Sequence, residues 1–107
     1  MKGIKTVYVV CWGNASQDND GNAAAFSGVH GVYAFKDDAK TGLEECKQEF
    51  VNELTNDSDF PREDRQEILD TMNIYGSVDD DFFEIDFETG GIPCEIYIHI
   101  VKKELMI

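Results

Sequence analysis

Residues 82–101 read FFEIDFETGGIPCEIYIHIV, and two alternating segments of this stretch decide the fold. Apolar and acidic side chains alternate over residues 82–88, and a second row of alternate apolar side chains runs through residues 94–101. Because successive side chains of a strand point to opposite faces, each segment is a strand with one core-facing side. The glycine-containing segment 89–93 supplies a turn, so the sequence predicts an antiparallel hairpin.

Two further strands are expected near the start of the chain. Residues 6–12 are β-branched and aromatic throughout, which is typical of a strand in the middle of a sheet, covered on both faces. Residues 29–35 form a second, shorter strand that should pair with the first, and the glycines flanking His30 indicate a bend or bulge near its start. Residues 13–27 between them exceed the usual connection length and are expected to form a long loop.

Two helices are expected between these pairs of strands. Residues 37–54 repeat apolar side chains at helical spacing behind Asp37 or Asp38, either of which can cap the helix. Its stripe should face the sheet, and it comprises Ala39, Leu43, Cys46, Phe50, Val51 and Leu54. A second helix should begin at Pro61 and run to Gly76, with Ile68, Leu69, Met72 and Tyr75 on its apolar side.

The order strand, strand, helix, helix, strand, strand predicts an α+β fold. Its four-stranded, mainly antiparallel sheet should pack one face on the two helices. The chain has 107 residues, 42% of them hydrophobic, which is the commonest domain size and enough for one core. We therefore expect one domain over residues 1–107.

Negative charge is concentrated in one part of the chain. Eighteen of the 22 acidic residues fall between Asp37 and Glu88. With the four basic residues of that segment they give it a formal charge of -14, and the rest of the chain adds +1, for a total of -13. Such a surface attracts basic partners and repels nucleic acid and anionic lipid. Direct nucleic-acid binding and a membrane partner are therefore not expected.

Cysteine use and the apolar runs indicate the compartment. Three cysteines at wide separation, with no CxxC pair, do not form a disulfide framework and read as small core side chains. No signal peptide is visible, and the longest apolar stretch is far shorter than the roughly 20 residues that cross a bilayer. A soluble, cytoplasmic protein is expected.

The acidic residues form candidate partner-binding arrays. Glu84, Asp86 and Glu88 should stand on one side of their strand about 6.7 Å apart, in a regular file that resembles the periodic charge of a nucleic-acid backbone. This file could be extended by Asp79, Asp80 and Asp81, and by Glu45 and Glu49 on the outer face of the first helix. Aromatic anchors for an interface are Tyr97, Phe82 and Trp12.

Catalytic and metal sites have weaker signals. Cys11 with His30 or His99 could pair a nucleophile with a base, but an inert thiol is expected beside large apolar residues. The run Asp79, Asp80, Asp81 with Glu84 could bind a divalent cation, whereas such runs are usually solvated. Ser16, Asp18, Asp20 and Gly21 match part of a calcium loop that lacks its final glutamate. We expect no enzyme, no cofactor and no metal site.

Small size, strong acidity, the α+β layout and the lack of an enzyme motif together resemble the anti-CRISPR and other anti-defence inhibitors of phages and mobile elements. The resemblance implies a basic, nucleic-acid-handling protein partner in the host cytoplasm, whose nucleic-acid site the chain blocks, as a DNA mimic. Acidic immunity proteins that neutralise nuclease toxins look similar and remain an alternative. Another alternative is a non-catalytic sensor or subunit whose acidic surface only keeps it in solution.

Overall fold

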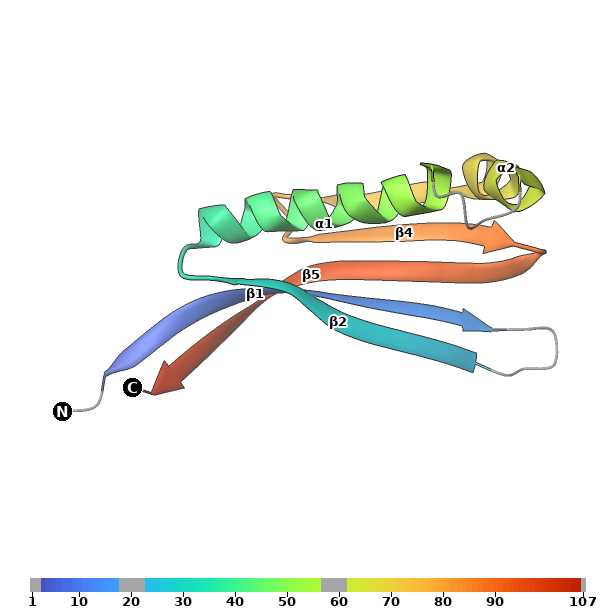
Figure 1. The fold of residues 1–107 in the computed structure, drawn as a ribbon. Coiled ribbons are helices and arrows are strands. Elements are labelled where there is room, and N and C mark those ends of the chain that lie inside the picture. Colours follow the sequence, from blue (N-terminus) through green and yellow to red (C-terminus); the bar gives the residue numbers. More distant parts are fainter. Residues whose placement is uncertain (1–2, 18–22, 57–61, 107) are drawn as a thin grey trace.

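Five strands and two helices make up the fold in the computed structural model, which describes residues 3–17, 23–56 and 62–106 (Figure 1). In chain order the elements are β1 (Ile4–Gln17), β2 (Ala23–Tyr33), α1 (Lys36–Asn56), α2 (Arg62–Thr71), β3 (Asn73–Ser77), β4 (Phe82–Thr89) and β5 (Ile92–Met106). The strands form one antiparallel sheet in the order β2-β1-β5-β4-β3. The predicted α+β class, antiparallel sheet and two helices are confirmed, and the predicted count of four strands is wrong.

The core lies between one face of the sheet and the two helices. The predicted alternation is confirmed, since Phe83, Ile85 and Phe87 of β4 are buried together with Ile96 and Ile98 of β5. The expected stripe of α1 packs against them, through buried Ala39, Leu43, Cys46 and Leu54 and half-buried Phe50 and Val51. From α2, Ile68 completes this cluster. We call the helix-bearing side the covered face and the other side the open face.

The strand that sequence reasoning missed is β3. Residues up to Tyr75 were expected in the second helix, but α2 ends at Thr71 and β3 pairs with the edge of β4. Thr71 ties the end of the helix to the sheet, because its hydroxyl donates to the Glu67 carbonyl and accepts the backbone N–H of Glu88 on β4. The spacing of Met72 and Tyr75 suits a helix by coincidence, and sheet pairing outweighs that local preference.

Strands β1 and β2 are longer than predicted. Their pairing is confirmed, but residues 13–17 and 23–27 continue the two strands where a long loop was expected. The predicted bulge is confirmed: Val10 faces Gly31 and Cys11 faces Val29, which leaves His30 as the extra residue. β1 is an interior strand as predicted, although the described helices cover one of its faces and not both.

The helix starts differ from the predicted caps. α1 begins at Lys36, where the Ala39 N–H donates to the Phe35 carbonyl, so Asp37 and Asp38 lie in the first turn and do not cap it. Carboxylates in a first turn still favour the helix, because they face its partial positive charge. The predicted start at Pro61 lies outside the described residues.

A two-residue turn joins β4 to β5. Gly90 and Gly91 have φ values of 59° and 76°, and Thr89 pairs with Ile92 across them. Both φ values lie in the left-handed region that a tight hairpin turn requires and that glycine adopts without strain. The turn therefore fixes the register of the whole β4–β5 pair, which confirms the predicted hairpin.

The molecule is elongated because β1 and β5 extend beyond the strands on either side of them. Beyond Tyr8 and His99, where pairing with β2 and β4 stops, the two strands continue as a ribbon to Ile4 and Met106 (Figure 1). The radius of gyration is 16.2 Å, against about 13 Å for a compact domain of this length. No described helix is long and apolar enough to cross a membrane.

Tight packing of Tyr33 generates a stability prediction. A Cβ atom at Gly42 of α1 would overlap the Tyr33 hydroxyl oxygen, and one at Gly31 would lie 2.6 Å from the same oxygen. We expect Gly42→Ala to lower the free energy of unfolding by about 1–3 kcal/mol through overpacking, although alanine is otherwise the better helix former by about 1 kcal/mol. Urea unfolding monitored by circular dichroism measures the change.

A double-mutant cycle separates the packing effect from helix propensity. In a Tyr33→Ala background, the ring that opposes a Cβ at position 42 is gone, so Gly42→Ala should become neutral or stabilising. An equal destabilisation in both backgrounds would contradict the assigned contact.

Candidate functional site

The open face carries the acidic residues of the β4–β5 hairpin. Since Phe83, Ile85 and Phe87 point to the helices, the alternation sends Glu84, Asp86 and Glu88 to the opposite side. From β5, Glu95, Tyr97 and His99 point the same way, because their cross-strand partners are Asp86, Glu84 and Phe82. The hairpin register therefore gathers carboxylates from two strands.

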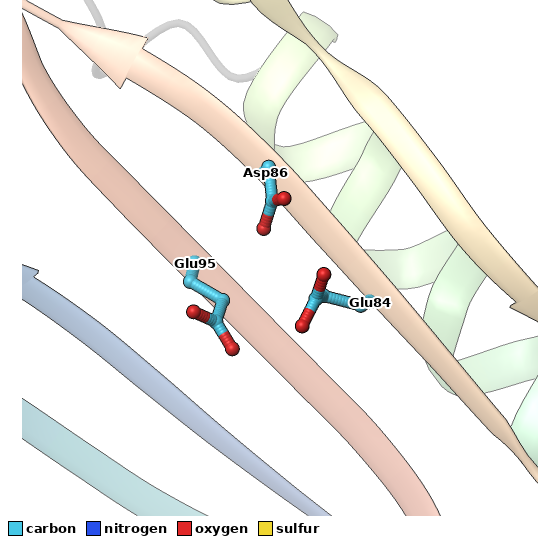
Figure 2. Close-up of side chains that lie close together, drawn as sticks. All are labelled: Glu84, Asp86 and Glu95. Atoms are coloured by element: carbon cyan, nitrogen blue, oxygen red, sulfur yellow. The ribbon is translucent and has the colours of Figure 1, made fainter.

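Three of these carboxylates form a close group, which we call the carboxylate cluster: Glu84, Asp86 and Glu95. One oxygen from each lies within 4.8 Å of the other two, and Figure 2 shows the three side chains pointing toward one another. Asp86 and Glu95 are direct cross-strand partners, an arrangement in which like charges destabilise a sheet. In the described part of the chain, no ion pair neutralises any of the three.

The cluster changes the acidity of its own members. Partial burial in the sheet face raises the pKa of Glu84, and the charges of Asp86 and Glu95 raise this pKa further. Both causes disfavour the ionised form, because the carboxylate loses water and meets like charge. The cluster thus holds negative charge at a free-energy cost, which an approaching cation would relieve.

An aromatic row lies beside the cluster. The rings of Phe82 and Tyr97 stack with centroids 5.6 Å apart, and the Tyr97 ring lies 5.0 Å from the His99 ring. Tyr97 is 38% exposed, so the row offers apolar surface with a polar edge next to the carboxylates. Of the predicted anchors, the structure brings Phe82 and Tyr97 together, whereas Trp12 lies against α1 on the covered face.

The predicted acids Asp79, Asp80 and Asp81 lie in the β3–β4 turn. Asp80 accepts the Ser77 hydroxyl and its N–H donates back to that oxygen, while Asp81 closes the turn at φ 64°. Their carboxylates also meet lysines of α1: Lys36 Nζ lies 2.9 Å from Asp81, and Lys40 Nζ lies 4.0 Å from Asp79. These aspartates build the turn and tie it to the helix start.

The remaining predicted acids fall into two places. Glu88 continues the file on β4 and is exposed near the strand end. Glu45 and Glu49 lie on α1, so the sheet separates them from the carboxylate cluster, and their carboxylates lie 3.8 and 3.6 Å from the His30 ring nitrogens. The predicted continuous array is thus divided between the open face, a turn and the helix layer.

Glu95 is the member of the site that sequence reasoning did not single out. Its signal was present, because a two-residue turn at Gly90 and Gly91 forces position 95 opposite position 86. Applying that register to the alternation of β5 would have placed Glu95 beside Asp86. The signal is the turn length, and not the local charge pattern.

The open face also carries the residues that are suited to metal binding. The cluster offers three oxygen ligands beside a cavity of about 570 Å³ at the end of the sheet, and hard cations such as Ca²⁺ and Mg²⁺ prefer oxygen. The predicted calcium-loop residues Asp18, Asp20 and Gly21 lie outside the described residues.

Cysteine chemistry gains no support from the geometry. Cys11 and His99 are cross-strand partners on the open face, but no hydrogen bond between their side chains is present in the described structure. A nucleophile–base pair requires that contact. All three cysteines are free thiols; Cys46 is buried, and Cys11 and Cys94 are half-buried.

Comparison of the chain with protein-family models, with curated proteins and with solved structures finds no match.

The raised pKa of Glu84 predicts a pH-dependent gain from Glu84→Gln. The folded-state pKa exceeds that of the unfolded chain, so ionisation destabilises the folded protein as pH rises through the folded-state value. Removing a like charge on facing strands is worth on the order of 0.5 kcal/mol, so Tm at pH 7 should rise by about 2–4 °C. Below the unfolded-state pKa, both states are protonated and the gain should disappear. Thermal unfolding between pH 7 and pH about 4 measures it.

Glu88→Gln is the control, because it removes the same charge from the same strand and face outside the cluster. It should leave Tm almost unchanged at both ends of the pH range. A Glu84→Gln variant that is less stable than the wild type at pH 7, or whose gain does not depend on pH, would refute the assigned electrostatic cost.

Proposed function

We propose that this chain is an acidic inhibitor that binds a basic nucleic-acid-handling protein through the open face and blocks its nucleic-acid site. The observation that carries the proposal is the carboxylate cluster, which gathers three acids on interior strands with no cation paired to them among the described residues. Its cost to the fold is relieved when a basic surface replaces solvent.

The position of the cluster argues against a purely protective role for these acids. Acidic side chains on edge strands discourage unwanted pairing with other chains. Here β4 lies between β3 and β5, and β5 lies between β1 and β4, so neither strand is an edge. Solubility does not require acids to face one another either, because the same charges spread over the surface would serve it at lower cost.

The spacing of the acids supports mimicry of a nucleic-acid backbone. Glu84, Asp86 and Glu88 follow each other at about 6.7 Å along β4, twice the strand rise, which is one charge for every two rises of about 3.4 Å in a nucleic-acid strand. Glu95 adds charge from the neighbouring strand. A groove lined by lysine and arginine would meet a compact block of negative charge.

The aromatic row supplies what charge alone lacks. Long-range attraction mainly raises the association rate, whereas buried aromatic residues contribute much of the binding energy of an interface. Phe82, Tyr97 and His99 stand next to the cluster, and Tyr75 of β3 pairs with Glu84 on the same side. Proteins that bind single-stranded nucleic acid stack its bases on their own aromatic rings. The aromatic row beside the carboxylate cluster would take the place of those bases against such a protein.

Affinity capture followed by a nucleic-acid competition assay tests the proposal. Wild-type chain, immobilised at low salt, should capture a basic nucleic-acid-binding protein from the host lysate, and capture should weaken at high salt. A Glu84→Gln, Asp86→Asn, Glu95→Gln variant should bind the captured protein at least ten-fold more weakly. Added wild-type chain should displace labelled nucleic acid from that protein.

The matched control removes the same number and types of charge elsewhere, through Glu63→Gln, Asp70→Asn and Glu104→Gln, all at exposed positions. It should retain the affinity of the wild type. Capture that survives the cluster variant, or a captured protein that binds nucleic acid equally well in the presence of the chain, would overturn the proposal.

A further inference from the structure

A second, chemically different pocket lies on the covered face, between α1 and the β1–β2 hairpin. It has a volume of about 360 Å³, and its lining includes Trp12, His30, Cys46, Glu49, Phe50 and Glu53. This volume lies at the lower end of the range for ligand pockets, about 300–1,000 Å³. The pocket is therefore sized for a small group, such as a single side chain.

Aromatic rings form the apolar part of the pocket. The Trp12 and Phe50 rings meet edge to face, with centroids 5.3 Å apart and planes at 70°. A Cβ atom at Gly28 would lie 2.7 Å from Cζ2 of Trp12, so the glycine leaves room for the indole to lie against β2. The indole is thus held in place on two sides, and indole is the best aromatic partner for a cation.

Carboxylates form the polar part. Glu49 and Glu53 are four residues apart on α1, so their side chains are neighbours on one helix face. Glu49 lies 3.6 Å from the His30 Nδ1, beyond ordinary hydrogen-bond distance, and no lysine or arginine of the described residues pairs with either glutamate. Both carboxylates are available to a donor from outside.

The electrostatic field of the pocket disfavours anions. Burial, followed by the charges of Glu49 and Glu53, raises the pKa of the Cys46 thiol to about 11. At the edge of the same region, burial and then Glu45 raise the pKa of the Tyr33 phenol. Burial is the main cause of both shifts, and the negative charges of the nearby glutamates act in the same direction.

We propose that this pocket receives an arginine side chain of a partner protein, with the guanidinium stacked on Trp12 and hydrogen-bonded to Glu49 and Glu53. A guanidinium is planar, is less strongly hydrated than an ammonium and presents a fork of donors that matches carboxylates. Lysine would satisfy the charge but not the stacking. This inference goes beyond the proposed function, because the pocket lies across the sheet from the carboxylate cluster and acts independently of it.

Fluorescence of the intact chain tests the pocket directly, because Trp12 is its one tryptophan. The probes are N-acetyl-arginine amide, its neutral analogue N-acetyl-citrulline amide and N-acetyl-lysine amide, all at constant ionic strength. We expect a saturable change with the arginine probe at a Kd on the order of 1–10 mM. The citrulline probe should bind at least ten-fold more weakly, and the lysine probe should be intermediate.

Variants separate the pocket from general acidity. Glu49→Gln with Glu53→Gln should weaken the arginine probe about ten-fold, and Glu53→Gln alone should show a smaller loss if the double variant does not fold. Glu63→Gln with Glu104→Gln removes the same charge at exposed positions away from the pocket and should leave the Kd unchanged. Circular dichroism confirms that each variant is folded.

Each other outcome overturns the proposal. Equal binding of arginine and citrulline would show that the pocket reads shape and not charge, and equal binding of arginine and lysine would show a non-selective cation site. A fluorescence change that the glutamate variants leave intact, or no saturable change, would place the response outside this pocket. The carboxylate-cluster variant should retain the wild-type Kd, which distinguishes a failure here from a failure of the open-face proposal.

Discussion

The register of the β4–β5 hairpin is the constraint on which the rest of the structure depends. The turn at Gly90 and Gly91 places Ile85 opposite Ile96, and both are buried under the helices. Because side chains alternate, a slip of one residue would exchange the two faces of the strand and expose the core. The apolar area buried on the covered face therefore holds the strands in a register that also sets Asp86 against Glu95 on the other face. Repulsion among the acids cannot be relieved by sliding.

Glycines play a corresponding role where α1 meets β2. Gly31 and Gly42 leave room for the Tyr33 ring, and Gly28 leaves room for Trp12. The bulge at His30 turns that imidazole toward α1, beside Glu45 and Glu49. Large aromatic rings are thus accommodated by small residues on two neighbouring elements, which lets α1 bring its acidic side close to the β2 edge. The pocket around Trp12 is a consequence of that close approach.

Sequence reasoning succeeded where one period dominated. The alternation of β4 and β5 and the apolar stripe of α1 follow directly from burial on one side, and the structure confirms them. It failed where pairing partners decide the outcome. Residues 13–17 are rich in small and polar side chains and read as a loop, yet all of them pair with β2 and residues 13–16 also pair with β5. Neighbouring strands thus determine whether a segment forms a strand. The same cause hid β3, which among the described strands pairs with β4 alone.

The candidate site was predictable to the extent that it follows alternation. Glu84, Asp86 and Tyr97 were correctly placed away from the core, but the predicted continuity with Asp79, Asp80, Asp81 and the helix could not be judged from charge alone. Lysines of α1 meet two of those aspartates through the tertiary fold, which no local pattern contains.

Stability explains the acids that the fold neutralises. The ion pairs of Asp79 and Asp81 with lysines of α1 stabilise both the β3–β4 turn and the start of the helix. Facing acids on interior strands form no stabilising contact with the described chain. Where residues destabilise the fold and no nearby contact compensates, function is the better explanation for them. The contrast between Asp81 and Asp86 therefore carries more weight than the total charge of -13. Asp81 and Asp86 both belong to the β3–β4 hairpin. Folding alone accounts for Asp81, which is paired with a lysine, but not for Asp86, which faces a like charge.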